Sequence, residues 1–175
     1  MASEASASQQ PTDREVVTEL IGRKPMGSFE VVVRRNDGSP VVLSNQPLLD
    51  DGRPMPTRFW LADRDLNRAI GRIESTGGVN QAEAEVPPEV IVEIHQAYEA
   101  ERNTLIDPSY EGHRPTGGVG GTRIGVKCLH AHYANLLAGA DDAIGRWVQA
   151  RLEATGDAFD PSQPGILSTW NSGTA

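Results

Sequence analysis

The sequence predicts an α+β fold in one small domain. Two β-branched runs, "SFEVVVRR" and "SPVVLSN", flank Asn-Asp-Gly at positions 36–38, which is a strong hairpin signal. Further along the chain, several segments repeat apolar residues at helical spacing between capping residues, prolines and glycines. A length of 175 residues favours a single domain. We therefore expect a β-hairpin with a possible third strand, packed by about five helices.

Both ends of the chain have the composition of disordered tails. Residues 1–11 are small and polar, and residues 157–175 are rich in Pro, Gly, Ser and Thr. Such segments bury too little apolar surface to offset the entropy lost on ordering. The predicted folded domain is therefore residues 12–156.

The first elements are predicted from local signals. Thr12 and Glu15 have the spacing of a capping box, and the short helix that they begin is expected to end at Gly22. The hairpin should pair residues 29–34 with residues 40–44. Three prolines then make the next connection irregular, and it leads into a short apolar strand at 59–61.

Four further helices follow from apolar residues at helical spacing. They begin after Asp63, at Pro87–Pro88, near Val126 and after Asp141 or Asp142. The first ends at Gly77–Gly78, the second before Asp107 and the last at Gly156. The buried stripe of the second includes Leu105. An irregular segment, "DPSYEGHRPTGGVGGTRIG", separates the second helix from the third, and a long irregular segment inside a domain is typically functional or disordered.

The composition excludes several classes of protein. With 16 basic and 24 acidic residues the net charge is −8, which argues against a nucleic-acid partner. No apolar run is long enough to span a membrane, and the first residues do not resemble a secretory signal. A single cysteine cannot form an internal disulfide. These features predict a cytoplasmic protein that binds neither nucleic acid nor membrane.

One segment, "GVKCLHAHYANLLAG" at 125–139, holds the only cysteine and two of the four histidines. A helix places its large apolar side chains on one stripe: Val126, Leu129, Tyr133, Leu136 and Leu137. On the same helix Cys128 and His132 lie one turn apart, whereas His130 points elsewhere. The spacing therefore predicts Cys128 and His132 as neighbours.

This spacing suggests a catalytic pair, with Cys128 as nucleophile and His132 as its proton acceptor in a hydrolysis or group transfer. A cysteine in the first turn of a helix is favoured as a thiolate by the dipole and the free amides. His130 would orient or cap the helix from its other side. The alternatives are that Cys128 is a small buried apolar residue and that His130 is a half-buried histidine bonded to the backbone.

The loop before this helix suggests an anion site for a phosphate-bearing small molecule. Its glycines allow close approach of a ligand to the backbone. From Glu111 to Lys127 three cations outnumber a single carboxylate, which gives this segment a net charge of +2. The proposed anion-binding residues are Arg114, Arg123, Lys127, Gly120 and Gly121. Alternatively, the same cations pair with carboxylates elsewhere on the surface.

Two other functions remain open at this point. A zinc ion could be bound by Cys128, His132 and His113, with His95 more remote, although Cys-x-His-x-His is not a recognised structural zinc pattern. A non-enzymatic interaction module would instead expose an apolar patch away from the motif, involving Phe59, Trp60 or Trp147.

The motif, followed by "DDAIG", resembles the uncharacterised bacterial family called domain of unknown function 501. "DGRPMPTRFWLA", "LNRAIGRIESTGGV" and "YEAERNTL" resemble other recurring segments of that family in the same order, over roughly residues 12–155. Relatives tend to carry a Cys-Pro pair where this chain reads "RRNDGSPV". The resemblance implies a cytoplasmic, mainly actinobacterial protein with no established activity. Genes of such proteins tend to lie near those for enolase, a septum-formation protein and an exopolyphosphatase-like enzyme, which hints at phosphate metabolism or cell division.

Overall fold

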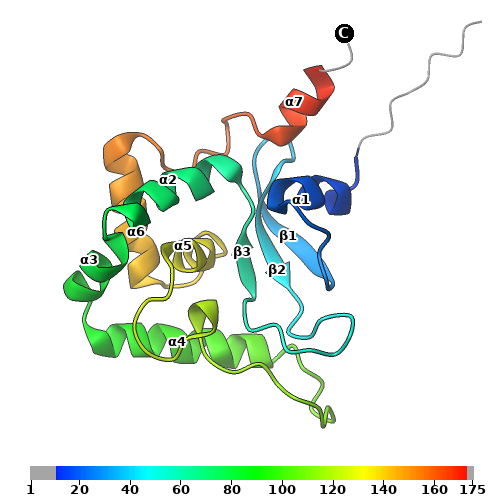
Figure 1. The fold of residues 1–175 in the computed structure, drawn as a ribbon, viewed down its shortest axis with the longest axis vertical. Helices are drawn as coiled ribbons and strands as arrows, with labels where there is room; N and C mark the ends of the chain where they lie inside the picture. The colour runs from blue at the N-terminus through cyan, green and yellow to red at the C-terminus, as the bar shows by residue number, and fades with distance from the viewer. Residues whose placement is uncertain (1–10, 173–175) are drawn as a thin grey trace, which may run out of the picture.

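A computed structural model describes residues 11–172 and confirms the α+β class (Figure 1). The described residues form a three-stranded antiparallel sheet and seven α-helices. The strands are β1 (Phe29–Arg34), β2 (Pro40–Asn45) and β3 (Phe59–Leu61). The helices are α1 (Asp13–Ile21), α2 (Arg64–Ser75), α3 (Gly78–Glu85), α4 (Pro88–Asn103), α5 (Leu129–Leu137), α6 (Ala143–Thr155) and α7 (Ile166–Ser172), with a 3₁₀ turn, η1, at Val119–Gly121.

The predicted hairpin and third strand are confirmed. β1 pairs with β2, placing Phe29 opposite Asn45 and Val31 opposite Leu43, and β3 adds to the other edge of β2. The hairpin turn needs a left-handed residue, which Gly38 supplies with φ of 87°. The Asn-Asp-Gly signal therefore located this turn correctly.

The sheet is covered on both faces. On one face α1 packs through Val17 against Leu43 and Ala62. The main core lies on the other face, where Phe59 and Leu61 of β3 meet the helices (Figure 1). The first four residues of β2 are all buried because this central strand is enclosed from both sides.

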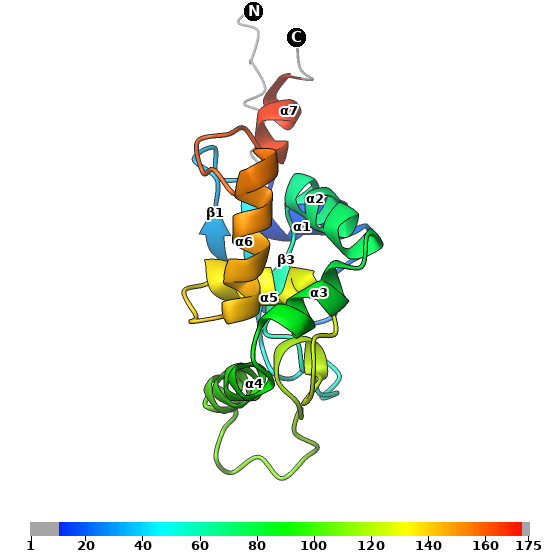
Figure 2. The ribbon, with the colours of Figure 1, turned by 90° about the vertical axis from the view of Figure 1, so that its left-hand side faces the viewer.

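The helix-capping predictions are confirmed at both ends of the chain. Thr12 and Glu15 form the reciprocal hydrogen bonds of a capping box. Asp63 begins α2, and Asp142 rather than Asp141 begins α6, which ends at Gly156 with φ of 76°. Figure 2 shows α6 running along the helical side of the molecule with α5 behind it. In the described part of the chain, no helix combines the length and apolar character needed to cross a membrane.

The sequence did not predict two of the helices, α3 and α7, and it placed Leu105 in the core incorrectly. The chain turns at Gly77, but α3 begins immediately afterwards because Gly78 can pack closely on Ile73, where a Cβ would lie 2.6 Å from its side chain. In α4 the inward positions near the end belong to Tyr98 and Arg102, and Leu105 is exposed.

The prediction of a disordered tail over 157–175 is also wrong for the residues that the structure describes. Residues 157–172 include α7 and fold against the hairpin turn, where the carbonyl of Pro161 accepts from the amide of Asn36. Asp37 accepts hydrogen bonds from the amide of Gly165 (2.8 Å) and the hydroxyl of Ser168 (2.7 Å). Polar contacts therefore hold this segment, which is why its low hydrophobicity was misleading. Of the predicted tail at 1–11, residues 1–10 lie outside the described residues.

We expect Asp37→Ala to undock α7, at a cost of about 1–3 kcal/mol for loss of hydrogen bonds to a charged acceptor. Hydrogen exchange should show lower protection for amides of residues 165–172, while the strands keep theirs. Asp51→Ala is the matched control, because the exposed Asp51 bonds only to nearby Arg53. Equal protection of α7 in both variants would contradict the docking role of Asp37.

The docking of α7 should also depend on pH. Burial raises the pKa of Asp37, but hydrogen bonds from Ser168, Ser39 and Gly165 outweigh this and hold the pKa well below its ordinary value of 3.8. The stabilisation of the folded state by ionised Asp37 is therefore fully present above the ordinary pKa of 3.8, and it is lost as the pH falls from there toward the lowered pKa. Protection of α7 should decline selectively in acid in the wild type. In Asp37→Ala that selective decline should be absent.

Candidate functional site

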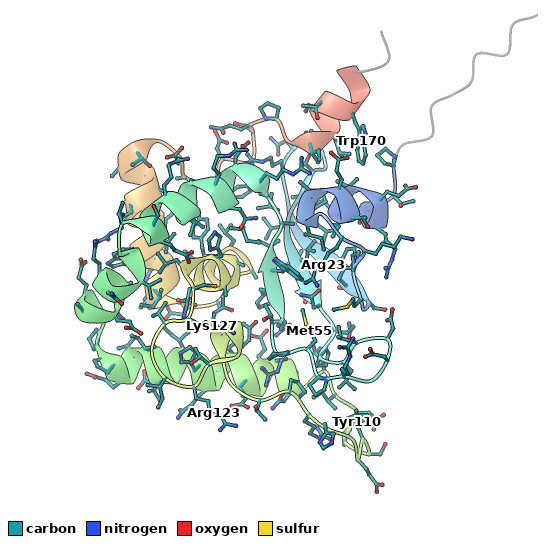
Figure 3. The ribbon with its side chains drawn as sticks, viewed as in Figure 1. Arg23, Met55, Tyr110, Arg123, Lys127 and Trp170 are labelled. Carbon is teal, nitrogen blue, oxygen red and sulfur yellow. The ribbon has the colours of Figure 1, made fainter. Side chains whose placement is uncertain are left out.

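A cleft of about 500 Å³ opens beside the start of α5. Segments that are distant in sequence build it: the α1–β1 and β2–β3 connections, β3, α2, η1, and α5 with the two residues before it. The lining residues are Arg23, Met55, Thr57, Phe59, Trp60, Leu61, Asn67, Gly120, Lys127, Cys128, His130 and Ala131. Figure 3 shows Arg23, Met55 and Lys127 around this region. The volume is in the range of small-molecule sites.

Cys128 is not in the first helical turn, contrary to the prediction. Its backbone is extended, with φ of −156° and ψ of 148°, and α5 begins at the next residue. Glu74 of α2 accepts from the amide of Leu129 at 2.6 Å, and Glu83 of α3 accepts from the amide of Val126 at 2.5 Å. Two carboxylates therefore bind the backbone amides at the start of α5. Because Cys128 precedes the helix, helical spacing does not describe its position relative to His130 and His132.

His130 is the histidine that lies with Cys128. A sulfur of Cys128, a ring nitrogen of His130 and a carboxylate oxygen of Glu74 all lie within 4.8 Å of one another. His130 Nδ1 is 3.1 Å from Glu74 Oε1, and its Nε2 is 3.1 Å from the carbonyl oxygen of Asn67. His130 is therefore half-buried and bonded to the backbone, as the structural alternative predicted, but it also lies beside Glu74 and Cys128.

The environment of His130 favours its charged form. Burial lowers the pKa of His130, but hydrogen bonds with Cys128 and with the carbonyl of Asn67, together with the charge of Glu74, raise it to about 9. Both ring nitrogens face acceptors, which an imidazolium satisfies with two N–H groups. The raised pKa and the two acceptors therefore favour the charged ring.

The predicted pairing of Cys128 with His132 is wrong. His132 is fully buried, and its Nδ1 lies 2.9 Å from Asp142 Oδ2. Asn135 also donates to Asp142, at 2.9 Å. No hydrogen-bonding atom of the described residues reaches His132 Nε2, so the thiol of Cys128 is out of range. His132 belongs to the packing of α5 on α6.

His95 is a structural residue behind the cleft. Its Nδ1 accepts from the amide of Val119 (3.1 Å), and its Nε2 lies 2.8 Å from the carbonyl oxygen of Gly125. Burial lowers the pKa of His95, which favours the neutral ring that this pattern requires. Gly118 packs directly on it, since a Cβ there would lie 2.4 Å from His95 atoms. The ring thus fastens the Gly-rich loop to α4.

Only two of the five predicted anion-binding residues line the cleft. Lys127 and Gly120 do, whereas Gly121 packs beside Pro56 outside it. Arg114 is exposed and donates to the carbonyls of Asp107 and Tyr110. Arg123 is exposed and lies away from Arg23 and Met55 in Figure 3. The loop cations are separated because Gly117 and Gly118 hold one part of the loop on α4, whereas Gly120 and Lys127 lie at the cleft.

A buried arginine holds this loop in place. Arg102 is fully buried and donates to the carbonyls of Gly117 (2.7 Å), Pro115 (2.9 Å) and Pro56 (3.1 Å). Pro56 lies next to Met55 in the cleft wall. Arg102 therefore joins the Gly-rich loop to the segment before β3, and this fixes the position of Gly120.

The predicted zinc ligands do not converge. His113 is exposed in the loop that carries Tyr110, which projects from the body of the molecule in Figure 3, and His132 is buried elsewhere. Within residues 11–172, the group of side chains with metal-ligand spacing is Glu74, Cys128 and His130. Cys128 is thus common to the predicted set and the observed one.

The aromatic patch expected of an interaction module is absent at the residues proposed for it. Phe59 and Trp147 are buried, and Trp60 lines the cleft together with Cys128. Nothing about these three side chains indicates a separate docking surface.

Glu74 and Arg23 are the site residues that sequence reasoning missed. Glu74 reads as an ordinary polar position on a helix, and Arg23 as one of two cations after Gly22. Neither stands near the motif in sequence: Glu74 and His130 are 56 positions apart. No local signal would have indicated them.

Comparison with known proteins identifies a family without supplying a function. A search of curated proteins and a search of solved structures each gave no significant match. Residues 31–150, which include most of the sheet as well as Glu74, Cys128 and His130, match the family described as "Protein of unknown function (DUF501)". The match covers more than half of the chain and agrees with the resemblance seen in its motifs, and this protein therefore belongs to the DUF501 family.

Proposed function

We propose that the cleft beside Cys128 binds an anionic, phosphate-bearing small molecule that also carries an apolar or aromatic group. The charge of the lining supports this proposal. Among the described residues that line the cleft there are two permanent cations, Arg23 and Lys127, and no carboxylate, in a chain with a net charge of −8. An arginine and a lysine that face the same cavity favour an anion such as phosphate.

The apolar part of the lining supports the second half of the proposal. Met55, Phe59, Trp60 and Leu61 supply the apolar lining of the cleft, with Trp60 on the opposite face of β3 from Phe59 and Leu61. Apolar walls with a few polar groups are typical of sites that bind small organic molecules. A ligand with a phosphate near Lys127 and Arg23 would place its apolar group along this lining.

Chemistry in the cleft would come from Cys128 and His130. His130 takes the place that the sequence suggested for His132, and it could act as the ion partner of a Cys128 nucleophile in a hydrolysis or group transfer. Glu74 would orient His130 from behind through its 3.1 Å contact.

Three probes separate the parts of this proposal: inorganic phosphate, phenol and phenyl phosphate. We expect phenyl phosphate to bind most tightly by calorimetry, because it alone satisfies both the cations and the apolar lining. Binding should also change the emission of Trp60. If phenol binds as tightly as phenyl phosphate, the cleft is a hydrophobic site and not an anion site.

Lys127→Gln and Arg23→Gln should each weaken phenyl phosphate binding about tenfold, equivalent to about 1.4 kcal/mol. Arg123→Gln is the matched control, since Arg123 is a cation of the same loop that lies outside the cleft. Its affinity should equal that of the wild type. An equal loss in all three variants would indicate a general effect of charge and would contradict the site.

A further inference from the structure

Three side chains of different chemistry converge at the wall of the cleft. The ligand atoms of Glu74, Cys128 and His130 lie within 4.8 Å of one another. Around a tetrahedral zinc ion, ligand atoms at about 2.0–2.3 Å from the metal are about 3.3–3.8 Å apart. Each observed separation is at most 4.8 Å, and the one between Glu74 and His130 is 3.1 Å, so side-chain movements of about 1 Å would bring all three to one ion.

The surroundings of the three groups have the features of a metal site. A zinc-bound histidine typically donates its second N–H to a carbonyl or carboxylate, which fixes the ring. His130 Nε2 faces the Asn67 carbonyl at 3.1 Å, and this leaves Nδ1 directed toward Glu74. Glu74 itself is fixed by the amide of Leu129 at 2.6 Å. Ligand positions are therefore set by α2 and by the start of α5 before any ion binds.

The donor set selects the kind of ion. Thiolate and imidazole favour zinc over magnesium, calcium or manganese, which prefer oxygen ligands. Three protein ligands are typical of a catalytic zinc, in which water or substrate occupies the fourth position. Cys128 and His130 both line the cleft, so a fourth position would be reached from it.

We propose that Glu74, Cys128 and His130 bind a zinc ion whose fourth coordination position opens into the cleft. This inference rests on the anion-binding function proposed above and extends it, because the ion would bind a phosphate oxygen of a ligand held by Lys127 and Arg23. On this proposal Cys128 is a metal ligand and not a free nucleophile.

Zinc binding to the full chain can be measured directly. We expect one zinc per chain by elemental analysis after loading and dialysis, and competition with a chromophoric chelator should give the affinity. Cobalt substituted into the wild type should show thiolate charge-transfer and tetrahedral d–d absorption. The absence of stoichiometric zinc, or a cobalt spectrum with no thiolate band, would overturn the proposal.

Variants identify the ligands. Cys128→Ser, His130→Gln and Glu74→Gln each remove a direct ligand, and each should weaken zinc binding by at least the roughly 10–100-fold that loss of an outer-shell partner costs. His113→Gln is the control, because this exposed histidine lies outside the converging group. Circular dichroism checks that each variant is folded. Unchanged affinity in a folded Cys128→Ser would rule this site out.

Different experimental results would refute the zinc proposal and the anion proposal. Phenyl phosphate binding that depends on Lys127 in a protein that takes up no zinc would refute only the metal site and leave Cys128 as a nucleophile. Stoichiometric zinc at the three ligands without phenyl phosphate binding would refute only the anion cleft.

Discussion

Replacing Asp142 with alanine is expected to lower the free energy of unfolding by about 3–5 kcal/mol. Asp142 is fully buried and accepts from His132 Nδ1 (2.9 Å), Asn135 Nδ2 (2.9 Å) and the amide of Gly145 (2.8 Å). Its removal leaves three donors in the core without an acceptor, and each buried donor that loses its partner costs about 1–3 kcal/mol. The same change removes the cap of α6. Urea unfolding followed by circular dichroism gives the value.

The neighbouring Asp141 provides a control for this prediction. Its side chain is 87% exposed and pairs with the exposed Arg146. Asp141→Ala should therefore change stability by no more than about 0.5 kcal/mol. Equal effects of the two substitutions would show that the buried carboxylate does not organise the packing of α5 on α6.

Replacing Arg102 with methionine is expected to destabilise the protein by about 3 kcal/mol and to disturb the cleft. Methionine is similar in length, so the main loss is of the hydrogen bonds to Pro56, Pro115 and Gly117, which leaves their carbonyls buried without a donor. Because these bonds place the Gly-rich loop, we also expect weaker phenyl phosphate binding. The loop should exchange its amide hydrogens faster than the strands do.

Arg114→Met is the matched control for Arg102→Met. Arg114 lies in the same loop and also donates to carbonyls, those of Asp107 and Tyr110, but it is exposed. Water replaces its hydrogen bonds, so stability and affinity should stay close to wild type. If Arg102→Met behaves like Arg114→Met, the loop is held by other contacts.

The local signals in the sequence were reliable where neighbouring residues decide the structure. The capping box at Thr12, the turn at Gly38 and the cap at Asp63 were located from a few adjacent residues, and the cap of α6 was narrowed to Asp141 or Asp142. These features depend on backbone amides and dihedral angles within about one helical turn or one hairpin. The prediction of disorder from composition was wrong for α7, because that segment is held by hydrogen bonds to Asp37, which lies more than 120 positions away in the sequence.

The candidate site shows the limit of reasoning from spacing. Helical spacing paired Cys128 with His132, yet the helix begins only at Leu129, and the extended backbone at Cys128 places it with His130. The start of α5 is set by Glu74, which is 55 positions from Leu129, and by Glu83. The later start of the helix, at Leu129 and not near Val126, therefore changed the partner of the cysteine.

The sequence alone thus established the fold class, the strand pairing, most helix boundaries and the segment that carries Cys128 and His130. Only the tertiary structure showed that His132 is buried on Asp142, that Glu74 stands beside His130, and that Arg23 and Lys127 share one cleft. The physical reason is the range of the interactions. Turns and caps are satisfied within a few residues, whereas a cleft, a buried carboxylate and a metal-ligand set form where elements far apart in the chain pack together.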